Sequence, residues 1–346
     1  MANTAVFGMG SWGTALATVL SDNGHQVKVW GRREDQVEEI NTKHTNERYL
    51  PGISLPDTIM ATTSMEEAVE DADTIVLVVP TKAMRTVLHK LNNHLSRPVA
   101  LVHASKGIET DTLKRISEII SEELDEDKRK NIAVLSGPSH AEEVVLRQPT
   151  TVTVSSTGAD SGQYIQDLFI NRSFRVYTNP DMVGVELGGA LKNIIALGAG
   201  LSDGIGFGDN AKAALMTRGL AEIARLGTKM GANPMTFAGL AGMGDLIATC
   251  TSAHSRNWRA GNLLGKGKQL QEVLDNMGMV VEGVKTTEAA YRLSEREGVE
   301  MPITNGLYDV LFSNQNPKQA VEGLMGRMRT DEVDDLSSLF AKQIQK

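Results

Sequence analysis

The segment Gly8-Met9-Gly10-Ser11-Trp12-Gly13 constrains the fold of this chain more than any other stretch. It matches the pattern G-x-G-x-x-G and stands between an apolar strand pattern at 4–7 and a helical pattern at 14–23. In that context Gly8 permits a tight turn, Gly10 lets the backbone approach a pyrophosphate, and Gly13 lets helix and strand pack closely. The helix N-terminus adds N–H groups and a positive dipole. The segment therefore predicts a dinucleotide-binding strand–turn–helix.

Apolar runs and amphipathic segments alternate over the first half of the chain. The expected strands are 4–7, 26–30, 58–62, 74–79, 99–103, 132–135, 150–154 and 174–177, and the expected helices include 13–23, 82–95, 111–124 and 159–170. Several strands are continuous Val/Ile/Leu runs, as expected of strands covered on both faces. This alternation predicts an α/β domain with a doubly wound parallel sheet.

Strand patterns end near Pro180, and helical patterns follow. They lie at 183–201, 211–230, 234–238, 270–276, 287–297, 303–312 and 317–324. A chain of 346 residues exceeds the usual size of one hydrophobic core. We therefore expect an NAD(P)-binding Rossmann domain at 1–185 and an all-α substrate-binding, catalytic domain at 186–346.

The composition limits the class of protein. A formal net charge of -8 argues against a nucleic-acid binder, because such proteins are usually basic. The single cysteine, Cys250, excludes an internal disulfide and fits a reducing compartment. No uninterrupted apolar run suggests a membrane helix, and no His/Cys/carboxylate cluster has metal-ligand spacing. We expect a cytoplasmic protein without membrane insertion, bound metal or nucleic-acid partners.

The end of the second predicted strand bears on the choice of dinucleotide. An acidic residue there would bind the ribose 2′-hydroxyl of NAD, but the segment is Trp30-Gly31-Arg32-Arg33. Two arginines suit a 2′-phosphate, so we expect NADPH to be accepted. The alternative, that one of these arginines is only a solvated surface charge, stays open.

Isolated cations among small residues are the candidates for chemistry. Lys106 follows the fifth strand, at the edge of the sheet where such folds bind ligands. Lys192 lies in a small, apolar helix, where burial would bring its pKa toward neutrality and suit it to proton transfer. A snorkelling lysine or a structural ion pair is the alternative.

Two further segments carry polar side chains at informative spacing. Asp245 and Thr249 are four residues apart, on one face of a predicted helix. Ser255 is a candidate N-cap, and Arg256 beside a helix N-terminus suits a phosphate group.

Together these segments resemble those of the bacterial NAD(P)-dependent glycerol-3-phosphate dehydrogenases. The resemblance extends over essentially the whole chain, and the set of motifs is far more specific than the glycine turn alone. The segments that carry it are Gly8–Gly13, Ser105–Glu109, Ser136–Glu143, Glu186–Gly200, Ala241–Gly261, Val280–Thr286 and Leu324–Arg329.

The resemblance implies reversible reduction of dihydroxyacetone phosphate to sn-glycerol 3-phosphate by NADPH or NADH, for phospholipid synthesis. It also implies a homodimer whose C-terminal domain is similar to that of 6-phosphogluconate dehydrogenase, with Lys192 as general acid/base. The implied substrate contacts are Lys106, Gly137, Ser139, Lys192, Asp245, Ser255, Arg256 and Asn257, with Asn193 and Thr249 as secondary candidates. The implied dinucleotide contacts, the three glycines included, are Gly8, Gly10, Ser11, Trp12, Gly13, Arg32, Arg33, Lys106, Ala141, Arg256, Val280 and Glu282.

Two other functions are weighed against this one. A related two-domain dehydrogenase would act on a β-hydroxyacid, since arginine binds carboxylates as well as phosphates. A non-catalytic NAD(P)-binding sensor would leave Lys106 and Lys192 without a purpose.

Overall fold

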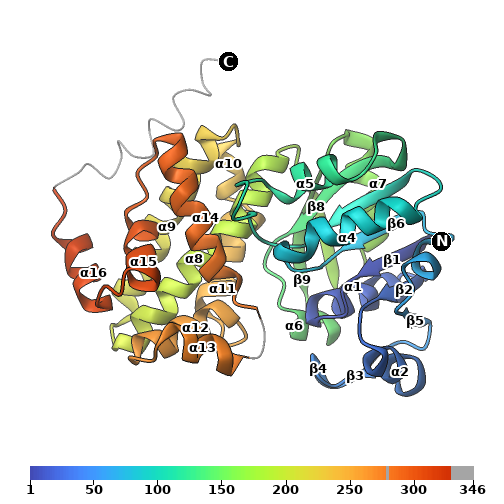
Figure 1. Cartoon of the computed structure of the whole chain (residues 1–346), viewed down its shortest axis with the longest axis horizontal. Helices are drawn as coiled ribbons and strands as arrows, with labels where there is room; N and C mark the ends of the chain where they lie inside the picture. The colour runs from blue at the N-terminus through green and yellow to red at the C-terminus, as the bar shows by residue number, and fades with distance from the viewer. Residues whose placement is uncertain (278–279, 329–346) are drawn as a thin grey trace. The chain divides into compact units, whose positions relative to one another are not determined.

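The computed structural model of the chain describes residues 1–277 and 280–328. By their internal contacts these residues form two compact units (Figure 1). The first comprises Met1–Ser105 and Ile116–Met182, and the second comprises Lys106–Arg115 and the chain from Val183 onward. The units differ from the expected division at 185/186 chiefly because Lys106–Arg115 goes with the second. Arg329 and the residues after it, which the sequence assigned to the helical domain, lie outside the described residues.

An eight-stranded sheet forms the centre of the first unit, in the order β10-β9-β8-β7-β6-β1-β2-β5. Its strands are β1 (Asn3–Phe7), β2 (Gln26–Trp30), β5 (Ile59–Thr62), β6 (Thr74–Leu77), β7 (Val99–His103), β8 (Arg129–Ser136), β9 (Thr150–Ser156) and β10 (Phe174–Thr178). Neighbouring strands are parallel except β8 and β9. The predicted doubly wound sheet is confirmed, with that one antiparallel pair. A small antiparallel pair, β3 (Thr45–Asn46) and β4 (Leu50–Ser54), was not predicted.

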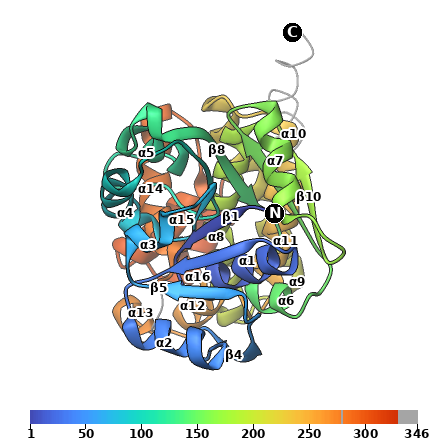
Figure 2. The same ribbon diagram turned by 90° about the vertical axis from the view of Figure 1, so that its right-hand side faces the viewer.

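Helices cover both faces of this sheet (Figure 2). One face carries α1 (Ser11–Asp22), α2 (Glu34–Lys43), α6 (Ala141–Val145) and α7 (Ala159–Phe169). The other face carries α3 (Met65–Val69), α4 (Thr81–His94) and α5 (Ile116–Glu123), and a short 3₁₀ helix (Glu126–Lys128) precedes β8.

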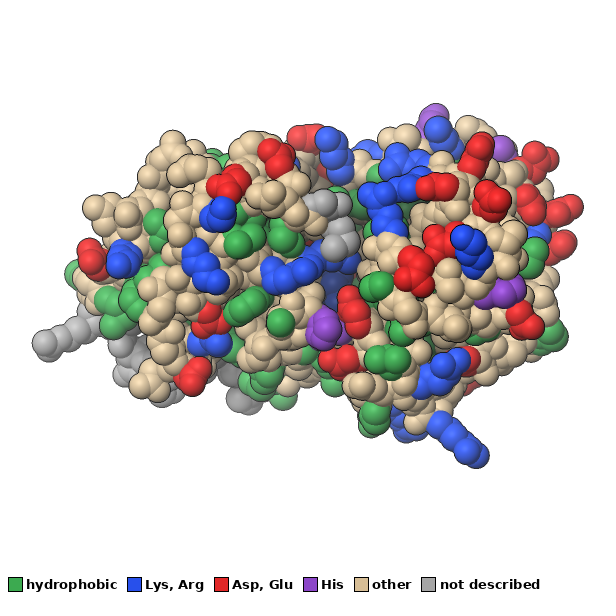
Figure 3. Space-filling view, turned by 90° about the horizontal axis from the view of Figure 1, so that it is seen from below, with side chains coloured by type: hydrophobic (Ala, Val, Ile, Leu, Met, Phe, Trp, Pro, Cys, Tyr) green, Lys and Arg blue, Asp and Glu red, His purple; other side chains and the backbone are tan. Residues whose placement is uncertain are grey.

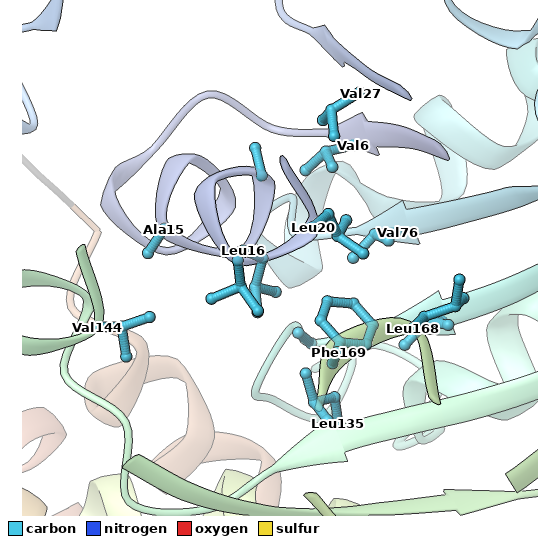
Figure 4. Packing of buried hydrophobic residues seen from close by; sticks show 14 of the residues in the cluster. Val6, Ala15, Leu16, Leu20, Val27, Val76, Leu135, Val144, Leu168 and Phe169 are labelled. Atoms are coloured by element: carbon cyan, nitrogen blue, oxygen red, sulfur yellow. The ribbon is translucent and has the colours of Figure 1, made fainter. Parts of the chain in front are cut away.

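The alternation of side chains along β1 explains the two cores. Val6 packs into the cluster under α1, whereas Ala5 and Phe7 pack into the cluster under α4, because successive strand residues point to opposite faces. In the first cluster Leu16 and Leu20 of α1 lie on the side of the helix that faces the sheet (Figure 4). Burying a leucine contributes about 1.5–3 kcal/mol, so this face fixes α1 on the sheet.

The glycine turn lies where the strand order reverses. From β1 the chain moves to β2 on one side, and it later returns to β6 on the other side. Gly8 has φ +123°, and a Cβ there would sit 2.7 Å from the carbonyl oxygen of Val78, just after β6. Ligands of doubly wound sheets bind at such a reversal, outside the carboxyl ends of the strands.

The second unit is helical, as predicted. Its helices are α8 (Met182–Ile205), α9 (Asp209–Lys229), α10 (Pro234–Phe237), α11 (Asp245–Thr251), α12 (Arg256–Gly265), α13 (Leu270–Met277), α14 (Glu282–Glu297), α15 (Pro302–Phe312) and α16 (Pro317–Met325), with a π-helical turn, η2 (Leu240–Gly244). By length and composition α8 is apolar enough to cross a membrane, but 89% of that stretch is buried inside the protein. This burial is typical of the central helix of a packed domain.

The segment Lys106–Arg115 folds differently from the prediction. A helix over 111–124 was expected, but α5 begins only at Ile116, so the prediction is wrong for 111–115. Ile108 and Arg115 instead form an antiparallel bridge, and Leu113 adopts a left-handed φ of 61°. Ile108 is buried in the apolar core of the second unit, which is why the segment belongs to that unit.

Candidate active site

Lys192 lies in α8 with its side chain only 6% exposed. Its Nζ contacts Oδ1 of Asp245 and donates a hydrogen bond to Oγ1 of Thr249 at 2.7 Å. Asp245 and Thr249 stand one turn apart in α11, on one face as the spacing predicted, and the Thr249 hydroxyl donates to the Asp245 carbonyl oxygen at 2.6 Å. The ammonium group of Lys192 is therefore held in one position by two side chains of α11.

Lys106 completes this cluster. Its Nζ lies 2.9 Å from Oδ2 of Asp245, so one carboxylate that is 2% exposed contacts two lysines. With all three groups ionised, the cluster carries one positive charge in excess. The Lys106 side chain is 20% exposed, so part of that charge is accessible to a ligand. A cluster of this kind attracts an anionic substrate.

The burial of these charges changes their protonation. Burial, together with the like charge of Lys106, lowers the pKa of Lys192 from 10.5 to about 7, against the opposing attraction of Asp245. For Asp245, burial alone would raise the pKa, but the two lysines outweigh it and hold the pKa below its usual value. Asp245 is therefore ionised at neutral pH, whereas Lys192 can lose or regain its proton there.

The close approach of α8 to η2 places Asp245 beside Lys192. A Cβ on Gly188 would sit 2.5 Å from the backbone oxygen of Ala241, a distance that real Cβ atoms do not reach. Only glycine at 188 allows α8 this close to the turn that leads into α11. Gly188 lies within one of the segments that carry the family resemblance, but no role was predicted for it from the sequence.

Two contacts anchor the segment that carries Lys106. Arg115 forms an ion pair with Glu186 of α8, and these side chains are 15% and 4% exposed. Arg292 of α14 donates a hydrogen bond to the carbonyl oxygen of Thr110 at 2.6 Å. This ion pair was not predicted from the sequence, although a carboxylate in an otherwise small and apolar helix was a usable signal for a buried partner.

The N-terminus of α12 holds the predicted anion-binding residues. Oγ of Ser255 accepts a hydrogen bond from the Trp258 N–H at 3.2 Å, which confirms the predicted N-cap. Arg256 is half-buried and forms no ion pair with the residues that the structure describes. A half-buried arginine without a carboxylate partner at a helix N-terminus suits a phosphate group.

The Asn257 side chain is engaged inside the protein. Its Nδ2 donates to Oδ1 of Asn193 at 2.9 Å, and its Oδ1 accepts from the Gly283 N–H at 2.8 Å. It thereby joins α12 to α8, next to Lys192, and to the first turn of α14. The contact of Asn257 with substrate stays a prediction.

The remaining residues assigned to the dinucleotide or to the substrate divide between the units. Gly8–Gly13, Arg32, Arg33, Gly137, Ser139 and Ala141 belong to the first unit and follow β1, β2 or β8. These strands run parallel within the sheet, so their carboxyl ends lie at one edge. Val280 and Glu282 lie at the start of α14 in the second unit.

The glycine turn fits a dinucleotide pyrophosphate. A Cβ on Gly13 would sit 1.9 Å from the Gly8 carbonyl oxygen, whereas one on Gly10 would have nothing within 4 Å. The first turn of α1 has no acidic residue, and no side chain caps the helix. The Ser11 hydroxyl donates to the Tyr49 carbonyl oxygen at 3.0 Å, so that side chain is engaged. The indole Nε1 of Trp12 is buried without a hydrogen-bond partner among the described residues.

The two arginines after β2 are not equivalent. Nε of Arg33 lies 3.0 Å from Oδ1 of Asp35, in a two-point ion pair. Arg32 is exposed and forms no ion pair with the residues described. After β8, Gly137 has φ +139° and Ser139 Oγ donates to the Gly137 carbonyl oxygen at 2.9 Å, which closes a tight turn before α6.

Other features of the second unit are separate from this cluster. A cavity of about 960 Å³ lies among α9, α15 and α16, and none of the predicted site residues line it. Burial raises the pKa of the Cys250 thiol to about 12, so this cysteine is no nucleophile at neutral pH. Among residues 1–277 and 280–328, no group of three or more His, Cys, Asp or Glu side chains could hold a metal ion.

Two family models cover nearly the whole described chain. Residues 3–161 match the N-terminal part of the NAD-dependent glycerol-3-phosphate dehydrogenases, and residues 181–322 match the C-terminal part. The chain belongs to the NAD-dependent glycerol-3-phosphate dehydrogenase family. The family predicted from the sequence is thus confirmed.

Relatives of this dehydrogenase family match over their full length. A glycerol-3-phosphate dehydrogenase [NAD(P)+] from Bacillus cytotoxicus is 65% identical over 339 residues, which is 98% of this chain and 99% of that protein. A solved glycerol-3-phosphate dehydrogenase from Coxiella burnetii is 37% identical with a TM-score of 0.90, over 94% of this chain and 99% of that one. The Saccharomyces cerevisiae enzyme is 30% identical with a TM-score of 0.80, over 92% and 98%.

More distant dehydrogenases share only the fold. A D-mandelate dehydrogenase is 13% identical with a TM-score of 0.60. The family match and the high identities therefore favour the glycerol-3-phosphate dehydrogenase function over that alternative.

Proposed function

We propose that this chain catalyses the reversible, NAD(P)-dependent reduction of dihydroxyacetone phosphate to sn-glycerol 3-phosphate, with Lys192 as general acid/base. The observation that carries the proposal is the buried ammonium group of Lys192, held by Asp245 and Thr249 and with its pKa lowered to about 7. A group that titrates near the working pH both donates and accepts a proton readily. Family membership supports the identity of the substrate.

The glycine turn and the N-terminus of α1 would hold the dinucleotide pyrophosphate. When bound, the dinucleotide supplies the hydride in reduction and accepts it in oxidation. In reduction the Nζ of Lys192 donates its proton to the oxygen of the former carbonyl, and its charge stabilises the negative charge that develops there. In oxidation the neutral Nζ accepts the hydroxyl proton. Asp245 and Thr249 keep Nζ in place in both directions.

The substrate phosphate is remote from the bonds that change. Arg256 and the N–H groups at the start of α12 form a site of suitable charge for it, and the partly exposed Lys106 adds a second cation. Binding this non-reacting group would orient the carbonyl toward Lys192. A β-hydroxyacid without a phosphate group would leave one of these cations uncompensated.

Arg32 is the residue that we assign to the 2′-phosphate of NADPH. It is exposed at the end of β2 and has no ion-pair partner among the described residues, whereas Arg33 is already neutralised by Asp35. Without an acidic residue at the strand end, NADH is accepted but gains no contact to its ribose hydroxyls there.

The cellular setting is also proposed from the family. We expect a cytoplasmic homodimer that is not inserted in a membrane and that supplies glycerol 3-phosphate for phospholipid synthesis. On the face shown in Figure 3, acidic and basic side chains are interspersed, which suits a small-molecule enzyme more than a nucleic-acid binder. Light scattering coupled to size-exclusion chromatography tests the homodimer; a monomer mass at micromolar concentration would contradict it.

The test of the function is a steady-state assay with a matched pair of variants. The oxidation of NADPH and of NADH is followed with dihydroxyacetone phosphate and, separately, with 2- and 3-ketoacids. We expect turnover with dihydroxyacetone phosphate only. No turnover with it would refute the proposal, and turnover with ketoacids alone would favour the hydroxyacid function.

Lys192→Met is expected to abolish turnover while dinucleotide affinity stays within about twofold, because Lys192 belongs to the helical unit and the glycine turn to the other. Lys128→Met is the control, since Lys128 also pairs with an aspartate, Asp125 at 3.1 Å, but stands just before β8, whereas the assigned residues of its unit follow their strands. Normal turnover in Lys192→Met would remove this lysine from the mechanism.

A further inference from the structure

Two buried amide side chains outside the G-x-G-x-x-G motif donate hydrogen bonds to the backbone of the glycine turn. The carbonyl oxygen of Met9 accepts two hydrogen bonds, from Nε2 of Gln36 at 2.6 Å and from Nδ2 of Asn46 at 3.1 Å. Gln36 comes from α2 and Asn46 from β3. Neither residue was predicted to have a role.

These hydrogen bonds form a closed network. Nε2 of Gln36 also donates to Oδ1 of Asn46 at 3.0 Å, and Nδ2 of Asn46 donates to Oγ1 of Thr14 at 2.8 Å. Both amide NH₂ groups therefore use both hydrogens, and the Met9 oxygen uses both lone pairs. Gln36 is 7% exposed and Asn46 is fully buried, so water cannot replace these contacts. Turning either amide around would place its oxygen against the Met9 oxygen.

The network sets the direction of one peptide group. In a trans peptide the C=O of one residue and the N–H of the next point in opposite directions, and the described residues contain no cis peptide bond. Because the Met9 C=O is directed at the buried amides, the Gly10 N–H is directed away from them. On that side the turn is partly exposed, and a Cβ on Gly10 would meet nothing within 4 Å.

Glycine at position 10 makes this constraint necessary. A residue without a side chain admits a close ligand, but its backbone also rotates more freely than any other. A rotated Met9–Gly10 peptide would present its carbonyl oxygen to the ligand and repel an anion. Gln36 and Asn46 remove that freedom without occupying the ligand's side of the turn.

We propose that Gln36 and Asn46 are positioning residues for dinucleotide binding: they fix the Met9–Gly10 peptide so that the Gly10 N–H faces a pyrophosphate oxygen. The proposal rests on the placement of the dinucleotide at this turn, given under the proposed function. The opposing possibility is that the network only ties α2 and β3 to α1. That role would affect stability and leave dinucleotide affinity unchanged in the folded protein.

The test removes the donor and keeps the shape of the side chain. Gln36→Met deletes both hydrogen bonds of Gln36, and dinucleotide affinity is measured without substrate from the fluorescence of NADH and NADPH. We expect the Kd of both to rise about tenfold, as the loss of one oriented contact predicts. At saturating dinucleotide, kcat and the KM for dihydroxyacetone phosphate should stay within about twofold, because the network contacts neither the substrate nor Lys192.

Gln166→Met is the matched control. Gln166 on α7 donates through Nε2 to the Val176 carbonyl oxygen at 2.7 Å, a contact of the same kind in the same unit but away from the turn. This variant should lose comparable stability in urea unfolding and keep the native Kd. An equal loss of affinity in both variants would mean general destabilisation, and it would overturn the proposal.

If the Gln36→Met protein does not fold, a second pair of variants tests the same proposal. Thr14→Val removes the acceptor of Asn46, whereas Thr18→Val removes a hydroxyl that bonds only to its own helix at the Thr14 carbonyl oxygen, 3.0 Å away. Only Thr14→Val should weaken dinucleotide binding. If the native protein binds dinucleotide and every folded variant of the network binds it equally well, the positioning role is refuted. If the native protein binds neither dinucleotide, the proposed function itself fails.

Discussion

Replacing Asp245 by asparagine isolates the effect of one charge on the proton of Lys192. The side chain keeps its shape, but the carboxylate that contacts Lys192 and lies 2.9 Å from Lys106 Nζ is lost. Burial and the charge of Lys106 then lower the pKa of Lys192 without opposition, so the pKa falls below about 7. A contacting opposite charge changes a pKa by about 1 to 3 units, which moves the midpoint for Lys192 to about 4–6.

The assay is the pH dependence of kcat/KM for oxidation of sn-glycerol 3-phosphate, which reports the free enzyme. Native rates should rise with pH through about 7, because the neutral amine is the base, and level off above it. In Asp245→Asn the rise should come at the lower pH, and the plateau should fall because a less basic amine accepts the proton less readily. At any given pH the two directions should change by the same factor, since a variant cannot change the equilibrium constant.

Asp203→Asn provides the control for this experiment. Asp203 pairs with Lys212 at 2.8 Å in the same unit but does not contact Lys192, so the native midpoint should persist. A midpoint near 7 in Asp245→Asn, with folding confirmed by thermal melting, would show that Asp245 does not control the protonation of Lys192.

Three further predictions follow from individual contacts. Arg32→Ala should raise the KM for NADPH about tenfold and leave the KM for NADH unchanged. Arg33→Ala should change both KM values little, because Arg33 is already paired with Asp35. Equal effects of Arg32→Ala on NADPH and NADH would contradict the assignment. Gly188→Ala should separate α8 from η2 and lower kcat at least about tenfold. Gly306→Ala is the control: its Cβ would have nothing within 4 Å, so it should leave kcat unchanged and stabilise α15 by up to about 1 kcal/mol. Burial raises the pKa of Glu222 from 4.5 to about 6, so the contribution of protonated Glu222 to the free energy of unfolding is complete below about pH 4.5 and is lost as the pH rises to about 6. Relative to the native protein, Glu222→Gln should therefore gain about 2 kcal/mol of unfolding free energy between pH 4 and 7. A pH-independent difference between the two proteins in urea unfolding would refute this.

The elements that could be predicted are those whose signal is local. Each expected strand of the large sheet was found, because buried parallel strands are continuous apolar runs. Ser255 was recognisable as an N-cap from its place before a helical pattern. Lys192 was recognisable because a lysine among small apolar residues needs a special environment.

The features that could not be predicted depend on contacts between distant parts of the chain. Gln36 and Asn46 are ordinary polar residues in sequence, and only folding brings both amides to one carbonyl oxygen. The segment 111–115 has a helical pattern, but burying Ile108 in the helical core stabilises the hairpin instead. The hydrogen bonds of the Asn257 side chain to Asn193 and Gly283 likewise join helices that are distant in sequence.

The placement of Lys106 has a consequence for how the acid/base group is prepared. Lys106 follows β7 of the sheet in sequence, but it pairs with Asp245 within the helical unit, as Lys192 does. The Arg115–Glu186 ion pair and the buried Ile108 hold it there. The two charged groups that shift the pKa of Lys192, Asp245 and Lys106, are therefore both supplied by one unit, and the glycine turn belongs to the other. It follows that a variant of the turn should change dinucleotide affinity and leave the pH midpoint of catalysis where it is.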